Sequence, residues 1–124
     1  MENYFENEFA SLCIHDKIMF VKFNGSIVLD LIVAQSVTKL RLRLQRDTLH
    51  AICYDISGII DSTKSGRDYF SMNCDLLVNA VSIHAGTETS FILACLFKRS
   101  KGNRTAFEIF RNLDCAVSFL EDFR

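Results

Sequence analysis

The sequence lacks the features that mark a multidomain, exported or membrane-spanning chain. It has no proline, no low-complexity run and no long polar linker, so nothing in it marks a boundary between domains. No run of about 18 apolar residues occurs, and the N-terminus is acidic where a signal peptide is basic and then apolar. We therefore expect one domain over residues 1–124, located in the cytoplasm.

An excess of charge of either sign is also missing. The chain carries 14 basic and 15 acidic residues, for a formal net charge of -1. This balance provides no broad positive field for nucleic acid or an anionic membrane, and we expect neither as a partner. A local basic cluster near the C-terminus is either a patch for phosphates or an acidic protein, or an ordinary solvated turn; it comprises Lys98, Arg99, Lys101, Arg104 and Arg111.

Signatures of metal binding, redox chemistry and catalysis are absent as well. The odd number of cysteines and the lack of CxxC spacing argue against a disulfide framework or a metal site. We predict buried, reduced thiols at Cys13, Cys53, Cys74, Cys95 and Cys115. Three histidines at predicted strand ends, with no ligand-spaced neighbours, are predicted to be turn or edge residues: His15, His50 and His84. No GxSxG, P-loop, GxGxxG or HExxH motif occurs, so we predict a non-enzymatic domain without metal or cofactor.

What the chain does contain is enough apolar sequence for a packed core, with 49% hydrophobic residues and 11 phenylalanines. Alternating apolar residues over Glu8–Phe23 predict two strands joined by a tight turn at Asp16-Lys17. Asp30 is predicted to cap a helix of about four turns. One apolar stripe of that helix comprises Val33, Val37, Leu40 and Leu44, and its C-terminal end is favoured by Arg41, Arg43 and Arg46.

Similar patterns predict the remaining elements. They are a buried strand His50–Ile56, a helix from Ser62 or Thr63 to about Leu77, a strand Ala80–His84, a helix Thr87–Lys98, a strand Thr105–Phe110 and a helix Leu113–Phe123. The inner side of the second helix is expected to carry Tyr69, Phe70, Leu76 and Leu77. The order ββαβαβαβα predicts an α/β domain with a mixed, mostly parallel sheet covered by helices.

Two short motifs accompany this order. Asp55-Ile56-Ser57-Gly58 ends the central strand, and Asp61-Ser62-Thr63 precedes the second helix. With the element order, they resemble the STAS family over nearly the whole chain. This family comprises SpoIIAA-like domains and includes the anti-sigma-factor antagonists. The stretch Thr63–Phe70 is similar to a helix start in uncharacterised stand-alone bacterial SpoIIAA-like proteins, although Lys64 stands where the antagonists have glycine.

The resemblance implies a SpoIIAA-like fold and a regulatory or protein-interaction role, in a monomer or weak homodimer. Its partner would be a protein such as a serine kinase or an anti-sigma-type regulator. The implied phosphoacceptor is Ser62, because the matching serine of the antagonists is phosphorylated by a partner kinase. The candidate partner-binding residues are Asp55, Ser57, Gly58, Asp61, Ser62, Thr63, Lys64, Gly66 and Arg67.

The chemistry of this loop supports two interpretations. A phosphate on Ser62 would meet free N–H groups in the first helical turn and add about 1.5 to 2 negative charges near Lys64 and Arg67. Alternatively, Ser62 or Thr63 only caps the helix, which contributes about 1 kcal/mol. Gly66, in the first turn, permits close approach of a partner or of the sheet.

A second functional hypothesis rests on the surplus of phenylalanine and leucine around the third predicted helix. The segment Phe91–Phe97 has too many apolar residues in a row for one clean helical stripe. Such a surplus is expected in a carrier of a small apolar or lipid-like ligand.

Overall fold

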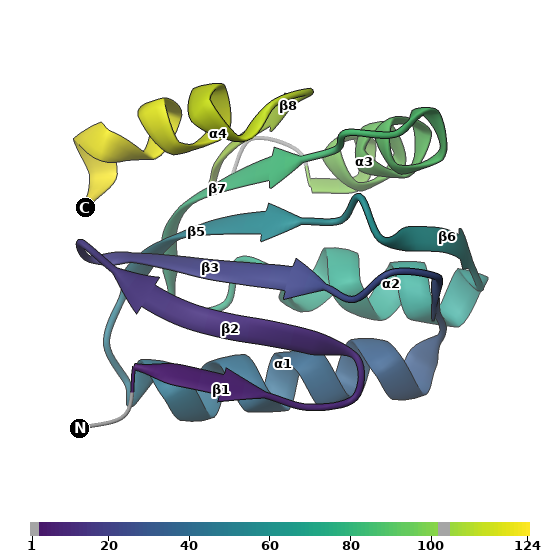
Figure 1. The fold of residues 1–124 in the computed structure, drawn as a ribbon, viewed down its shortest axis with the longest axis horizontal. Helices are drawn as coiled ribbons and strands as arrows, with labels where there is room; N and C mark the ends of the chain where they lie inside the picture. Colours follow the sequence, from purple (N-terminus) through teal and green to yellow (C-terminus); the bar gives the residue numbers. More distant parts are fainter. Residues whose placement is uncertain (1–2, 102–104) are drawn as a thin grey trace.

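The computed structural model describes residues 3–101 and 105–124 of the chain. Its main sheet has the strand order β1 (Tyr4–Glu6), β2 (Ala10–His15), β3 (Ile18–Phe23), β5 (His50–Asp55), β7 (Val78–His84) and β8 (Ala106–Phe110), as Figure 1 shows. The strands β1, β2 and β3 pair antiparallel, whereas β3, β5, β7 and β8 pair parallel. The predicted mixed, mostly parallel sheet is confirmed.

Helices cover both faces of this sheet. In the described residues they are α1 (Leu31–Gln45), α2 (Lys64–Asn73), α3 (Glu88–Lys101) and α4 (Leu113–Leu120), with a 3-10 turn, η1, at Glu121–Phe123. Residues of α1, α2 and α3 share the larger core with one face of the sheet, while Ala116 and Leu120 of α4 pack in a smaller core on the other. We call the face that packs against α4 the back face.

The opening hairpin and the first helix form where the sequence predicts them. Asp16 and Lys17 have positive φ angles of 53° and 68°, the backbone of a tight hairpin turn. Asp30 caps α1, since its carboxylate accepts a hydrogen bond of 2.9 Å from the N–H of Val33.

Three short strands were not predicted. β1 extends the sheet at one edge, and β4 (Ile27–Leu29) pairs parallel with β6 (Ile59–Ser62) as a separate two-stranded sheet. Figure 1 shows β6 beyond the carboxyl end of β5, where the sequence suggested only a loop. Strands of three or four residues are too short for apolar alternation to reveal.

Helix α2 is shorter than predicted, because it ends at Asn73 and not near Leu77. Leu76, which was expected on the inner side, is 52% exposed, and Leu77 adopts a left-handed backbone with φ of 64°. The chain therefore turns away from the helix before Leu76.

Buried side chains from neighbouring elements hold this turn in place. Arg41 is 1% exposed, and its guanidinium donates hydrogen bonds to the carbonyl oxygens of Asn73 at 2.9 Å and Leu76 at 3.0 Å. Gln45 accepts another bond from Arg41 and donates one of 2.8 Å to the carbonyl of Leu77. Arg41 thus supports the end of α2, a role beyond the one expected from its position in α1.

The prediction of five buried, reduced thiols is confirmed only in part. All five cysteines are free, but only Cys53 and Cys74 are buried, whereas Cys115 is exposed. In the basic cluster, Lys98 pairs with Glu108, and the guanidinium of Arg111 lies 4.8 Å from the centre of a phenylalanine ring. The side chains of Lys101 and Arg104 lie outside the described residues. No helix in the described ranges has the length and apolarity needed to cross a membrane.

Candidate functional site

The candidate site lies at the carboxyl ends of the central strands β5 and β7, where the connections to α2 and α3 begin. Ligand-binding loops of open α/β sheets gather at this edge, since the parallel strands all end there. The site has two parts, which we call the strand-end network and the β6–α2 segment.

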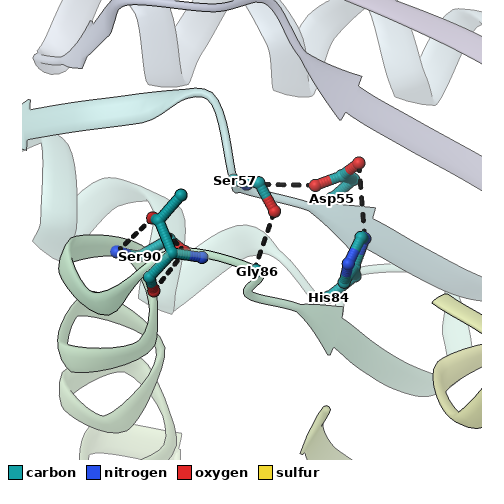
Figure 2. A network of polar contacts seen from close by, with 6 residues as sticks. Asp55, Ser57, His84, Gly86 and Ser90 are labelled. Carbon is teal, nitrogen blue, oxygen red and sulfur yellow. Dashed lines mark hydrogen bonds and ion pairs between the residues drawn. The ribbon is translucent and has the colours of Figure 1, made fainter. Parts of the chain in front are cut away.

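The strand-end network joins the ends of β5 and β7 through polar side chains (Figure 2). One carboxylate oxygen of Asp55 accepts a hydrogen bond of 3.0 Å from the N–H of Ser57. The other lies 3.4 Å from Nδ1 of His84. The hydroxyl of Ser57 accepts a hydrogen bond of 2.8 Å from the N–H of Gly86. Asp55 and Ser57 are therefore held against β7.

His84 is a member of this network that sequence reasoning missed. His84 ends a strand as predicted, but that strand is the central β7 and not an edge strand, and His84 is the register partner of Asp55. The two side chains are 18% and 21% exposed, so both are accessible at the rim of the sheet. Predicting the register between β5 and β7 would have revealed that His84 and Asp55 are neighbours. No spacing along the sequence encodes that register.

Gly86 and the start of α3 complete the network. A Cβ at Gly86 would lie 3.1 Å from the hydroxyl of Ser57 and 3.5 Å from Nε2 of His84, so the glycine leaves the space between them open. Thr87 and Ser90 cap α3 reciprocally, with N–H to hydroxyl distances of 3.0 and 3.1 Å. Figure 2 shows this cap beside Gly86. The cap fixes the chain immediately after the network.

The β6–α2 segment separates the two roles that the sequence left open for its hydroxyl residues. Thr63 is the N-cap of α2, because its hydroxyl accepts a hydrogen bond of 3.1 Å from the N–H of Gly66. Ser62 ends β6 and is half-buried. Its hydroxyl accepts a hydrogen bond of 3.0 Å from Arg67 Nη1, which also donates to the Ser62 carbonyl at 3.2 Å. Helix capping therefore does not occupy Ser62.

Two predicted site glycines serve close backbone packing. A Cβ at Gly58 would lie 2.2 Å from the carbonyl oxygen of Asn24, and one at Gly66 would lie 2.2 Å from that of Leu29. The close approach expected at Gly66 is thus to the end of β4. By contrast, Lys64 is exposed, and its ammonium pairs with Asp68 at 2.7 Å.

A shallow groove runs beside Ser62, between β6 and α3. Its volume is about 140 Å³, and it is lined by Ile59, Ile60, Asp61, Ser62, Thr89, Ile92, Leu93 and Leu96. Three of these apolar side chains are exposed, namely Ile60 at 57%, Ile92 at 56% and Leu96 at 41%. We call this the β6–α3 groove.

The groove accounts for only part of the apolar surplus in Phe91–Phe97. Leu93, Ala94 and Phe97 are buried in the main core, where the Phe97 ring lies 4.6 Å from that of Phe70. Most of the surplus that suggested a carrier of apolar ligands therefore packs the fold.

The nine predicted site residues divide between the two parts. Asp55 and Ser57 belong to the strand-end network, with Gly58 packed immediately after it. The segment from Asp61 to Arg67 borders the groove and the start of α2. Within residues 3–101 and 105–124, no three histidine, cysteine, aspartate or glutamate side chains are arranged to hold a metal ion.

Comparisons with known proteins place this geometry in a family and a fold. The model of a family described as a domain of unknown function (DUF7793) matches residues 12–124. A crystal structure of an uncharacterised DUF3478-family protein from Shewanella loihica PV-4, with a SpoIIAA-like fold, is similar at a TM-score of 0.65. The two chains are 13% identical over 94% of this chain and 98% of the other, so the likeness concerns the fold. No curated protein matches by sequence. The predicted SpoIIAA-like fold is confirmed.

Proposed function

Since this chain belongs to the family described as a domain of unknown function (DUF7793), we propose its function from the site itself: a non-enzymatic regulatory domain that docks a protein partner. The docking surface is the β6–α2 segment together with the β6–α3 groove. The SpoIIAA-like fold agrees with this role, because the anti-sigma-factor antagonists that the sequence motifs resemble act by protein contact.

The observation that carries the proposal is the row of exposed isoleucine and leucine side chains in the groove. Ile60, Ile92 and Leu96 expose between 41% and 57% of their surface, and they lie on two elements that face each other. Clustered exposed apolar side chains rimmed by polar residues are typical of protein interaction sites. Asp61 and Ser62 supply part of that polar rim.

Ser62 is positioned to control docking at this groove. Its hydroxyl already contacts Arg67, so a phosphate there would exchange a neutral hydrogen bond for a charge-assisted one with the same guanidinium. The neighbouring Asp61 carboxylate would repel the new charge and favour a rearrangement of the segment. Phosphorylation of Ser62 by a serine kinase would therefore alter the rim of the groove while leaving the Thr63 cap intact.

The proposal is tested by affinity capture from an extract of the native host, followed by titration of each purified candidate partner. The test variant is Ile60→Asp, and the matched control is Met72→Asp, because Met72 is also a large exposed apolar residue, at 74%. We expect the true partner to bind the wild type and Met72→Asp equally and Ile60→Asp at least about tenfold more weakly.

The phosphorylation step is tested with the same purified partner and the variants Ser62→Asp and Ser62→Ala. The expected result is a changed affinity for Ser62→Asp and a nearly unchanged one for Ser62→Ala. Equal affinity of the wild type, Ser62→Asp and Ser62→Ala would overturn the proposed control by phosphorylation but not the docking surface. A partner that loses no affinity for Ile60→Asp would overturn the docking surface itself.

A further inference from the structure

A second cavity lies on the back face of the sheet, beside the start of α4. Its volume is about 170 Å³, and its apolar walls include Cys13 of β2, Phe20 of β3, Cys53 of β5 and Leu113 of α4. Two charged residues, Lys22 and Asp55, also line it. Helix α4 packs against β5, β7 and β8, and the cavity opens beside its first residue, Leu113, towards β2 and β3.

The two charges lie side by side at the carboxyl end of the strands. Lys22 and Asp55 are register partners on the parallel strands β3 and β5, so their side chains project on the same face. Asp55 is oriented by the N–H of Ser57 and by His84, and each of its oxygens keeps capacity for a further hydrogen bond. Lys22 is exposed and forms no ion pair with any residue in the described ranges.

The remaining walls of the cavity are uncharged at neutral pH. Burial raises the pKa of the Cys13 thiol above its ordinary value. Burial also raises the pKa of Cys53 to about 11, and the Asp55 charge adds to this. Both thiols therefore stay protonated. The cavity presents one cation and one anion above an apolar floor.

We propose that this cavity binds a free α-amino acid with a branched aliphatic or phenyl side chain. The carboxylate of the ligand lies at Lys22, its ammonium lies at Asp55, and its side chain fills the space between Phe20, Cys53 and Leu113. A cavity of about 150 Å³ holds a benzene molecule, so the observed volume suits a side chain of that size. A ligand with only one charge could pair with only one of these two residues.

Calorimetric titration of the full chain with L-leucine and L-phenylalanine tests the proposal. The matched probes are 4-methylpentanoate and 3-methylbutylamine, which keep the leucine side chain but lack the ammonium or the carboxylate. We expect at least one of the two amino acids to bind with one site per chain, and each matched probe to bind at least about tenfold more weakly than leucine or not at all. Failure of both amino acids to bind the folded chain would overturn the proposal.

Variants assign the binding to this cavity. Lys22→Gln and Asp55→Asn are each expected to lower the affinity at least about tenfold, whereas Lys39→Gln, on α1, should not. Leu113→Trp narrows the cavity from α4 and should abolish binding; Leu113 is 43% exposed, so the fold tolerates the change. Unchanged affinity in Lys22→Gln and Asp55→Asn would overturn the assignment.

This inference is independent of the proposed docking function, because the cavity lies across the sheet from the α1–α3 layer. Ser62→Asp should leave amino-acid binding unchanged. The two proposals can therefore fail separately.

Discussion

The two ends of helix α2 lie in opposite environments. At the C-terminal end, Arg41, Gln45 and Tyr54 donate hydrogen bonds to backbone carbonyls, and all three side chains are 1% exposed. At the N-terminal end, the Thr63 cap and the ion pair of Lys64 with Asp68 are exposed to solvent. The polar contacts of one end are buried in the core, whereas the side-chain contacts of the other lie in solvent, apart from the close packing of Gly66 on β4.

The chemistry of the buried end explains why it tolerates a positive charge. The C-terminus of a helix carries partial negative charge on its unpaired carbonyls, and Arg41 supplies both the donors and the counter-charge. Removing the guanidinium would leave buried acceptors without their donor, and removing the acceptors would leave a buried charge. Either loss costs far more free energy than an exposed contact contributes. The comparison therefore predicts large stability effects at one end and small ones at the other.

The largest effect is expected for Arg41→Leu. This change keeps apolar volume but removes the Arg41 donor from the carbonyl of Leu76 and from the side-chain oxygen of Gln45, while the Asn73 carbonyl keeps the N–H of Leu76. We therefore expect a loss of about 3 to 5 kcal/mol in the free energy of unfolding. Urea denaturation measures it. Arg43→Leu, two residues further along α1 and exposed, is the control and should cost less than about 1 kcal/mol. Similar losses in the two variants would contradict the buried role of Arg41.

Gly66→Ala is expected to cause the next largest loss of stability. It tests the close packing of the first turn of α2 against β4. The new Cβ would lie 2.2 Å from the Leu29 carbonyl oxygen, and backbone cannot move aside as a flexible side chain can. We expect a loss of about 2 to 3 kcal/mol, measured by denaturation. Ser65→Ala, in the same helical turn but exposed, should stay within about 0.5 kcal/mol.

Tyr54→Phe tests the third donor at the buried end and predicts a dependence on pH. Its hydroxyl donates a hydrogen bond of 2.7 Å to the carbonyl of Cys74, and we expect its removal to cost about 1 to 2 kcal/mol. The pKa of Tyr54 is raised, and burial is the largest cause. The nearby Arg41 charge opposes the rise, whereas Cys74 and Asp75 add to it.

The sign of that pH dependence follows from proton binding. The native state holds the Tyr54 proton more tightly than the unfolded chain does, so its contribution is complete below the unfolded pKa of about 10 and declines above it. Wild type should therefore lose more stability than Tyr54→Phe between neutral pH and about pH 11. Parallel decline of the two proteins in pH-dependent denaturation would show that Tyr54 does not titrate as expected.

These contrasts also show which parts of the structure the sequence could reveal. The hairpin, the Asp30 cap and the four helices rest on local periodicity and on residues with strong turn or cap preferences, which act within a few positions. The end of α2 was missed because Arg41 reaches it across 32 residues, and the pairing of His84 with Asp55 was missed because it arises from strand register. The β6–α3 groove likewise depends on β6 facing α3, which no local pattern encodes.

The smallest effects on stability are expected for Thr63→Ala and Ser62→Ala, and this pair separates the structural role from the regulatory one. Thr63→Ala should cost about 1 kcal/mol, because its hydroxyl caps α2, whereas Ser62→Ala should cost less than about 0.5 kcal/mol. Thermal denaturation measures both. If docking follows the proposed mechanism, position 62 matters more than position 63 in partner titrations. There, Ser62→Asp should alter the affinity for the partner more than Thr63→Ala does. A larger loss of stability in Ser62→Ala than in Thr63→Ala would instead show that Ser62 has a structural role. It would contradict the proposal that the segment before α2 rearranges when Ser62 is phosphorylated.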